Sequence, residues 1–185
     1  MKRSLALLLF ATVILSSCLR NYREYGNEKV PGYKPVFSNN PDDYIAKSLE
    51  PQPIKNPGKI YVKDNLLFQS DEGYGIHVID KTDPAKLKNI GFIRMIGNSD
   101  MSIKGNYMYV NSITDLVVVD ISNWQNVKEV KRMENVFQAG QQSNFYGPMI
   151  PLPEKGAYYE CQNLYRQGYV QIGWVKDSVM SYCRY

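Results

Sequence analysis

The sequence of 185 residues predicts an all-β fold that contains two similar four-stranded units. The two units share a pattern at a separation of 41 residues, so that Lys63 and Asn65 recur as Lys104 and Asn106. A repeat of about 40 residues made of four short apolar runs is typical of β-propeller blades. The chain also contains 15 tyrosines, a residue type that favours strands over helices.

Each repeat can be divided into four expected strands. We expect the first blade repeat over 58–98, with strands at 59–62, 65–70, 76–79 and 88–93, and the second over 99–137, with strands at 101–104, 106–111, 116–119 and 127–132. The third strand of each repeat is almost entirely apolar, which predicts burial of both of its faces. Asp80 and Asp120 follow these third strands, and we expect them to accept hydrogen bonds from the backbone two residues on.

The N-terminus has the three parts of a secretory signal peptide over residues 1–17. Lys2 and Arg3 precede an apolar run at 5–15, and small residues follow it. The run is too short to span a bilayer as a helix, which takes about 20 residues. Leu15-Ser16-Ser17-Cys18 resembles a bacterial lipobox, and this resemblance implies cleavage before Cys18 and lipidation of its thiol. The alternative is an ordinary signal peptide that contains a cysteine.

Residues 18–57 are expected to be a lipidated N-terminus and a tether. Six of the ten prolines fall in 19–57, and the segment shows no sustained apolar periodicity. The stretch 42–49 is compatible with one short helix that begins near Asp42.

Residues that could carry chemistry are few. His77 is the single histidine, and on an apolar strand it is expected to be a packed residue with one satisfied nitrogen. Asp71-Glu72-Gly73 is expected to be a solvated turn, because it lacks the spaced oxygen ligands of a calcium loop. Glu154 and Glu160 are the nearest approach to an acid–base pair. The sequence therefore predicts no catalytic residues, no metal site and no cofactor.

The C-terminal region, 138–185, is expected to contain a surface loop at 138–153 and a strand at 169–174. Cys161 and Cys183 are candidates for a disulfide, which would contribute on the order of 3 kcal/mol by the loop-entropy model. Two free thiols, or metal or redox chemistry, are the alternatives.

The C-terminal region also contains a candidate binding face of aromatic side chains. Its residues are Tyr158, Tyr159, Tyr165, Tyr169 and Trp174. Aromatic rings beside amides suit saccharide stacking or protein contact. The alternative is that these rings pack the terminal sheet.

The run Leu116-Val117-Val118-Val119-Asp120 resembles the repeat that gives the LVIVD-repeat proteins their name. The wider stretch 56–136 looks like the lipoprotein branch of that family. The resemblance implies blades of a β-propeller-like fold, and the family has no known catalytic residues to transfer. Closed propellers need about four to eight blades, so two repeats predict an incomplete propeller. Either the C-terminal strands complete a small stacked-sheet domain, or another subunit covers the blades.

These observations together predict a bacterial envelope lipoprotein that is not an enzyme. We expect it to be anchored to the outer membrane through Cys18, to face the periplasm, and to bind a protein partner or to self-associate. The alternative function is a glycan-binding or glycan-processing accessory that uses the aromatic face. The net charge of +4 falls to +2 once Lys2 and Arg3 are removed, which is too nearly neutral to indicate nucleic-acid binding.

Overall fold

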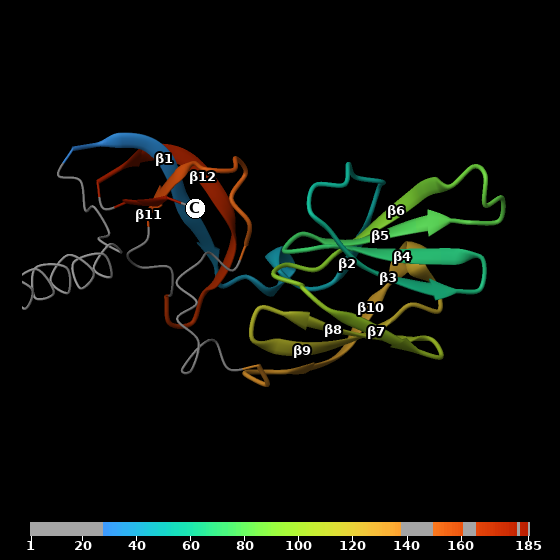
Figure 1. The fold of residues 1–185 in the computed structure, drawn as a ribbon. Coiled ribbons are helices and arrows are strands. Elements are labelled where there is room, and N and C mark those ends of the chain that lie inside the picture. Colours follow the sequence, from blue (N-terminus) through green and yellow to red (C-terminus); the bar gives the residue numbers. More distant parts are fainter. Residues whose placement is uncertain (1–27, 138–149, 161–165, 181, 185) are drawn as a thin grey trace, which may run out of the picture.

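A computed structural model describes residues 28–137, 150–160, 166–180 and 182–184 of the chain (Figure 1). The described residues form three β-sheets, which confirms the all-β, propeller-like prediction. Two of the sheets are the predicted blades and pack face to face. The third sheet lies at one end of the pair and joins N-terminal to C-terminal strands.

The first blade contains strands β3 (Pro57–Lys63), β4 (Leu66–Asp71), β5 (Gly75–Asp80) and β6 (Lys88–Arg94). The second blade contains β7 (Met101–Lys104), β8 (Tyr107–Ser112), β9 (Asp115–Asp120) and β10 (Lys128–Met133). Each blade is an antiparallel meander in chain order, as the repeat predicts.

The two blades match in detail as well as in strand order. Their first hairpins turn at Asp64 and Gly105, 41 positions apart, with φ angles of 52° and 59°. Such positive φ angles suit Gly and are tolerated by Asp. Each fourth strand has a bulge that leaves one residue unpaired, Ile90 in β6 and Val130 in β10. The two blades therefore share their backbone irregularities as well as their strand order.

The aspartates after the third strands fix the turns, as predicted. Asp80 Oδ1 accepts hydrogen bonds from the backbone N–H of Thr82 at 2.8 Å and from its hydroxyl at 2.6 Å. Asp120 Oδ1 accepts one from the N–H of Ser122 at 2.8 Å. These bonds stabilise the carboxylate form and lower the pKa of both aspartates.

We predict that Thr82→Val raises the pKa of Asp80 toward its ordinary value, because the Thr82 hydroxyl is the largest cause of the lowered pKa. Ser122→Ala should move the pKa of Asp120 less, because the backbone N–H of Ser122, which is retained, has the larger influence there. A depressed folded-state pKa contributes stability above the unfolded pKa, and this is lost as pH falls through the folded value. An NMR titration of the carboxyl carbons measures both shifts, and equal shifts would contradict the prediction.

The inner faces of the two blades form one apolar core. It includes Phe68 and Val78 from the first blade and Met108 and Val117 from the second, all essentially inaccessible to solvent. The Tyr61 hydroxyl crosses the interface and donates a 2.6 Å hydrogen bond to the carbonyl of Ile103. Lys59 and Asp100 form an ion pair at 2.6 Å. The blades are thus stabilised by burial of apolar surface between them.

Burial of the third strand differs from expectation in the second blade. Both faces of β5 are buried, as predicted, but in β9 burial alternates, and Leu116 and Val118 on its outer face are half-buried. The outer face of β5 is covered by the chain before β3, whereas that of β9 has no described strand over it. The prediction of two buried faces was therefore wrong for β9.

The expectation of a tether and a short helix was also wrong for residues 30–49. Strand β1 (Val30–Ser38) pairs with β12, and a three-residue 3₁₀ helix, η2 (Pro41–Asp43), replaces the expected longer helix. Strand β2 (Lys47–Leu49) adds a fifth strand to the first blade by pairing with β6. The Ser48 hydroxyl donates to the carbonyl of Trp124 at 2.7 Å, so β2 also holds the second blade.

The third sheet has the order β12-β1-β11-β13. Strands β11 (Tyr158–Glu160), β12 (Val170–Val179) and β13 (Tyr182–Arg184) supply its C-terminal part, and β12 confirms and extends the strand expected at 169–174. Tyr33 and Tyr159 are buried in its core, and Trp174 packs against them. The C-terminal strands therefore form a separate sheet with β1 instead of extending the blades.

Candidate functional site

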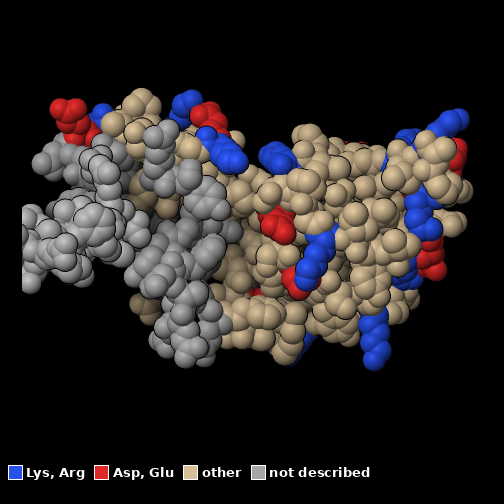
Figure 2. All heavy atoms as spheres, viewed as in Figure 1, with Lys and Arg blue, Asp and Glu red and all other residues tan. Residues whose placement is uncertain are grey.

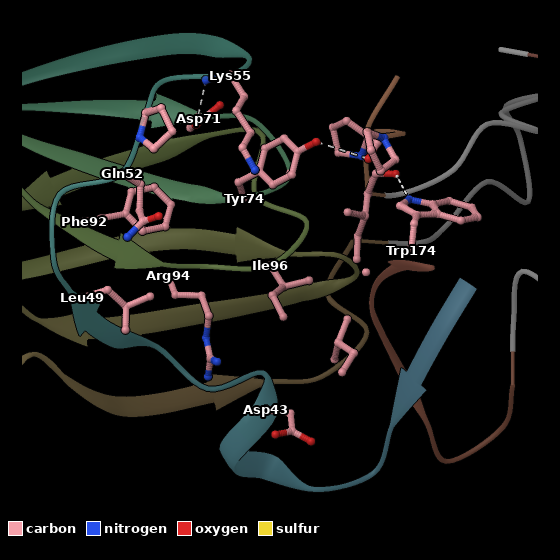
Figure 3. A pocket seen from close by; sticks show the side chains of 17 residues that line it. Asp43, Leu49, Gln52, Lys55, Asp71, Tyr74, Phe92, Arg94, Ile96 and Trp174 are labelled. Atoms are coloured by element: carbon pink, nitrogen blue, oxygen red, sulfur yellow. Dashed lines mark hydrogen bonds between the residues drawn. The ribbon is translucent and has the colours of Figure 1, made fainter. Parts of the chain in front are cut away.

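The candidate site is a cavity of about 570 Å³ between the first blade and the third sheet. Phe92 and Arg94 of β6 and Tyr74 of the β4–β5 turn line it from the blade side, and Trp174 of β12 lines it from the other (Figure 3). Gln52, Pro53 and Lys55, between β2 and β3, form a further wall. Aromatic and aliphatic side chains dominate the lining, as is usual for small-molecule sites.

Two hydrogen bonds link the opposite walls through the chain at 150–151. Trp174 Nε1 donates to the carbonyl of Ile150 at 2.9 Å, and the Tyr74 hydroxyl donates to the carbonyl of Pro151 at 3.4 Å (Figure 3). A Cβ added to Gly73 would lie 2.0 Å from Cδ of Pro151. The β4–β5 turn therefore approaches the chain at 150–151 more closely than a larger residue would allow.

A buried polar network lies beneath the cavity. His77 Nε2 lies 3.1 Å from Asp71 Oδ2, and His77 Nδ1 lies 3.3 Å from Asn89 Nδ2. The tautomer with its proton on Nε2 satisfies both contacts, because Nε2 then donates to the carboxylate and Nδ1 accepts from the amide. His77 is packed, as predicted, but both of its ring nitrogens have partners.

Asp71 completes this network by holding the chain before β3. Its two carboxylate oxygens accept the backbone N–H groups of Lys55 at 3.1 Å and Asn56 at 2.6 Å. Asn89 Nδ2 also donates to the carbonyl of Gln52 at 2.9 Å. The network fastens residues 50–56 over the outer face of the first blade. The prediction of a solvated turn was therefore wrong for Asp71, which is almost completely buried.

The cationic groups at the cavity already have contacts. Arg94 donates from one guanidinium nitrogen to the carbonyls of Asp42 at 2.8 Å and Ile45 at 3.1 Å. The Lys55 ammonium lies 4.7 Å from the centre of the Tyr74 ring, within cation–π range. These contacts position the walls of the cavity and leave its apolar surface as the main feature open to a ligand.

Among the described residues of the predicted aromatic face, the structure brings the rings of Tyr159 and Trp174 together. Trp174 lines the cavity, whereas Tyr159 is buried and meets Trp174 edge-to-face with ring centres 5.8 Å apart. Tyr169 is half-buried just before β12 and stacks under the Arg166 guanidinium at 4.1 Å, and Tyr158 is half-buried in β11. Tyr165 lies outside the described residues. Tyr159 thus packs the terminal sheet, which was the alternative interpretation of these rings.

Sequence reasoning missed Tyr74, Phe92 and Arg94 as lining residues of the cavity. They come from one blade, whereas Trp174 lies about 80 positions or more further along the chain. The acidic turn Asp71-Glu72-Gly73, directly before Tyr74, was the one sequence feature near these residues that had been considered as a site. No spacing rule connects these segments, because their proximity depends on how the third sheet packs against the blade.

The remaining predicted residues occupy separate places. Cys183 in β13 is disulfide-bonded. Cys18 and Cys161, the two other cysteines, lie outside the described residues, so the pairing of Cys161 with Cys183 stays a prediction. The Glu154 carboxylate forms an ion pair with Lys176, with Oε1 3.6 Å from Nζ, and Glu160 is the last residue of β11.

The described residues contain neither a metal-ligand cluster nor a membrane-spanning helix. No group of three or more His, Cys, Asp or Glu side chains there is arranged to hold a metal ion. Within the same residues, no helix has the length and apolar character needed to cross a membrane.

Comparison with known proteins assigns the second blade. Residues 97–134 match the model of the LVIVD repeat family, and this range contains β7 to β10. No curated protein and no solved structure matches the chain. The match confirms the resemblance found around Leu116–Asp120. The chain therefore contains an LVIVD repeat, a repeat of the β-propeller-like kind, as its second blade.

Proposed function

We propose that the protein is a lipid-anchored envelope protein whose paired blades bind a protein partner without catalysis. The anchor would be Cys18, and the mature chain would begin there. The signal-peptide pattern before Cys18 supports this proposal. The disulfide at Cys183 also supports an oxidising compartment outside the cytoplasm.

The position of β1 sets how the domain would sit on the membrane. Eleven residues, 19–29, separate Cys18 from Val30, and a chain of that length reaches at most about 40 Å. Strand β1 begins on the side of the third sheet furthest from the blades (Figure 1). The third sheet would therefore lie nearer to the lipid, and the blades would project away from it.

The observation that carries the interaction role is the outer face of the second blade. Tyr107, Tyr109 and Met133 are exposed large apolar residues on this one face of the sheet. In Figure 2, residues other than Lys, Arg, Asp and Glu cover most of the visible surface of the blades. Exposed apolar side chains gathered on one face of a sheet typically mark a protein-interaction site.

For the anchor, we predict that Cys18→Ser releases the protein from membranes. The serine hydroxyl cannot take the place of the thiol that carries the diacylglycerol. Radiolabelled palmitate should enter the wild-type chain and not the variant. Labelling that persists in Cys18→Ser would contradict the anchor.

For the interaction face, we predict that a photo-crosslinking amino acid at position 109 captures a protein in intact cells. The same group at position 175 is the matched control, because Val175 is also an exposed apolar strand residue but belongs to the third sheet. Capture from 109 and not from 175 is the expected result. Equal capture from both positions, or none from 109, would contradict the proposed face.

We also propose outer-membrane residence with the domain facing the periplasm, because Leu19 follows Cys18 and no acidic run comes after it. Protease added to intact cells should leave the domain uncut and should cut it once the outer membrane is permeabilised. Digestion in intact cells would place the domain on the cell surface.

Glycan binding is a second candidate, and the cavity favours it. Tyr74, Phe92 and Trp174 present aromatic surface there, which suits stacking against sugar rings. A glycan array probed with the wild-type chain and with Tyr74→Ala tests this function. Signals that Tyr74→Ala leaves unchanged would show that the cavity is not the glycan site.

A further inference from the structure

The two blades do not pack through equivalent faces. In the first blade, the packed face contains Tyr61, Phe68, Val78 and Ile93, and we name this face A. In the second blade, the packed face contains Met101, Ile103, Met108 and Val117, and we name it face B. By the repeat, face B of the first blade contains Ile60, Val62, Leu67 and His77, and face A of the second contains Ser102, Tyr109, Val118 and Met133. The interface is therefore head-to-tail, with A against B.

This arrangement leaves one face A and one face B without a blade against them. Tyr109 and Met133 are 37% and 39% exposed, although Phe68 and Ile93, their equivalents in the packed face A, are 1% and 0% exposed. Ile60 and Val62 are 57% and 55% exposed, against 8% and 6% for their equivalents Met101 and Ile103. Face A of the second blade and the part of face B around Ile60 and Val62 thus carry exposed apolar side chains on the two outer sides of the blade pair.

Charge also matches between the open faces. Lys59 and Asp100 occupy equivalent positions, 41 residues apart, and pair across the internal interface at 2.6 Å. If a second copy placed its face B against the open face A, Asp100 of one copy would stand where Lys59 stands internally. Lys59 of the other copy would then stand in the place of Asp100. The charges exchange sides and remain opposite. Because Lys59 and Asp100 already pair within each copy and are more than half exposed, the contact would bring two such ion pairs side by side.

Side-chain size matches in the same way. In the internal interface, Trp124 covers Gly91, where an added Cβ would lie 2.4 Å from the indole ring. By the repeat, Pro84 corresponds to Trp124, and Lys131 corresponds to Gly91. Between copies, Pro84 of one copy would therefore cover Lys131 of the other, so that a smaller residue than Trp124 covers a larger one than Gly91. Pro84 is exposed at the turn after β5. The exchange leaves room for the Lys131 side chain.

We propose that a second copy of this chain is the partner of the blades, bound head-to-tail through face A of one copy and face B of the next. This inference rests on the interaction role proposed above and names its partner. Residues 50–56 already cover the half of face B around His77, so the contact is made by the half around Ile60 and Val62. Each copy brings two blades, and closed propellers contain about four to eight, so a closed ring would hold about two to four copies.

The test is complementation between two single-face variants of the full chain. Ile60→Glu damages the open face B, Tyr109→Glu damages the open face A, and Val175→Glu is a matched control on the third sheet. Native mass spectrometry of the lipidated chain released from detergent micelles measures the number of copies. Thermal melting checks that each variant is folded, which exposed positions should permit.

We expect two to four copies for wild type and Val175→Glu, and single chains for Ile60→Glu and for Tyr109→Glu alone. Mixing the two variants should restore a species of two chains, because Ile60→Glu retains face A and Tyr109→Glu retains face B. A monomeric wild type, or a mixture that stays monomeric, would overturn the inference. Loss of association in Tyr109→Glu alone would indicate a symmetric A-to-A dimer and would also overturn it. Failure here is distinct from failure of the interaction role, because capture of an unlike protein from position 109 would uphold that role without self-association.

Discussion

Val117→Asp is expected to prevent the chain from folding. Val117 is fully buried in β9, between the two blades, and a carboxylate there would have no partner. Burying an unpaired charge costs several kcal/mol or forces its protonation. Since a domain of this size is stable by only about 5–15 kcal/mol, soluble expression should fall sharply. Circular dichroism and thermal melting of the non-lipidated chain measure the effect.

Val118→Asp is the matched comparison, one residue further along the same strand. The Val118 side chain lies on the outer face of β9 and is half-buried, so its carboxylate would stay in contact with water. We expect a loss of about 1 kcal/mol, in the ordinary range for a partly exposed site. Equal destabilisation by the two substitutions would contradict the register of β9.

Asp71→Ala is expected to produce the second large loss of stability. It removes the acceptor for two backbone N–H groups and for the ring of His77, which is inaccessible to solvent. The buried His77 ring left without its acceptor costs about 1–3 kcal/mol, and each of the two part-buried backbone hydrogen bonds contributes about 1 kcal/mol, so a total of roughly 3–5 kcal/mol is expected. Chemical denaturation should show the loss, and amide exchange should accelerate at Lys55 and Asn56.

Asp177→Ala provides the control for Asp71→Ala. Asp177 pairs with Lys34 at 2.8 Å, but half of its side chain is exposed, and such surface pairs contribute little. Its loss should leave the denaturation midpoint nearly unchanged. If Asp71→Ala behaves like Asp177→Ala, the network beneath the cavity does not hold residues 50–56.

The blades could be predicted from the sequence because their signals are local and repeated. The recurrence of Lys63-Asp64-Asn65 as Lys104-Gly105-Asn106 marks equivalent hairpins, and Asp80 and Asp120 mark equivalent turns. Each signal concerns residues within a few positions of one another, so backbone chemistry alone determines the result.

Strand β1 could not be predicted in the same way. Pro31 and Pro35 argue against a strand, because proline cannot donate to a sheet. They are tolerated because the three-residue strand β11 meets β1 at Tyr33, so most of that side of β1 is open. The partner of β1 is β12, about 140 residues away, and no local pattern announces such a pairing.

The cavity depended on the same long-range packing. Tyr74 and Trp174 reach it from sheets whose contact the sequence does not encode locally. The outer face of β9 was misjudged for a related reason. An apolar run such as 116–119 shows that both faces could be buried, but not whether a covering element exists.

The most direct measurement of the paired-blade structure is the nuclear Overhauser contact between Tyr61 and Ile103 in the isotope-labelled, non-lipidated chain. The Tyr61 hydroxyl lies 2.6 Å from the Ile103 carbonyl, although these residues belong to different blades. We predict clear contacts from the Tyr61 ring protons to the backbone protons around Ile103. Ring contacts confined to β3 and β4 would contradict the face-to-face packing of the two blades.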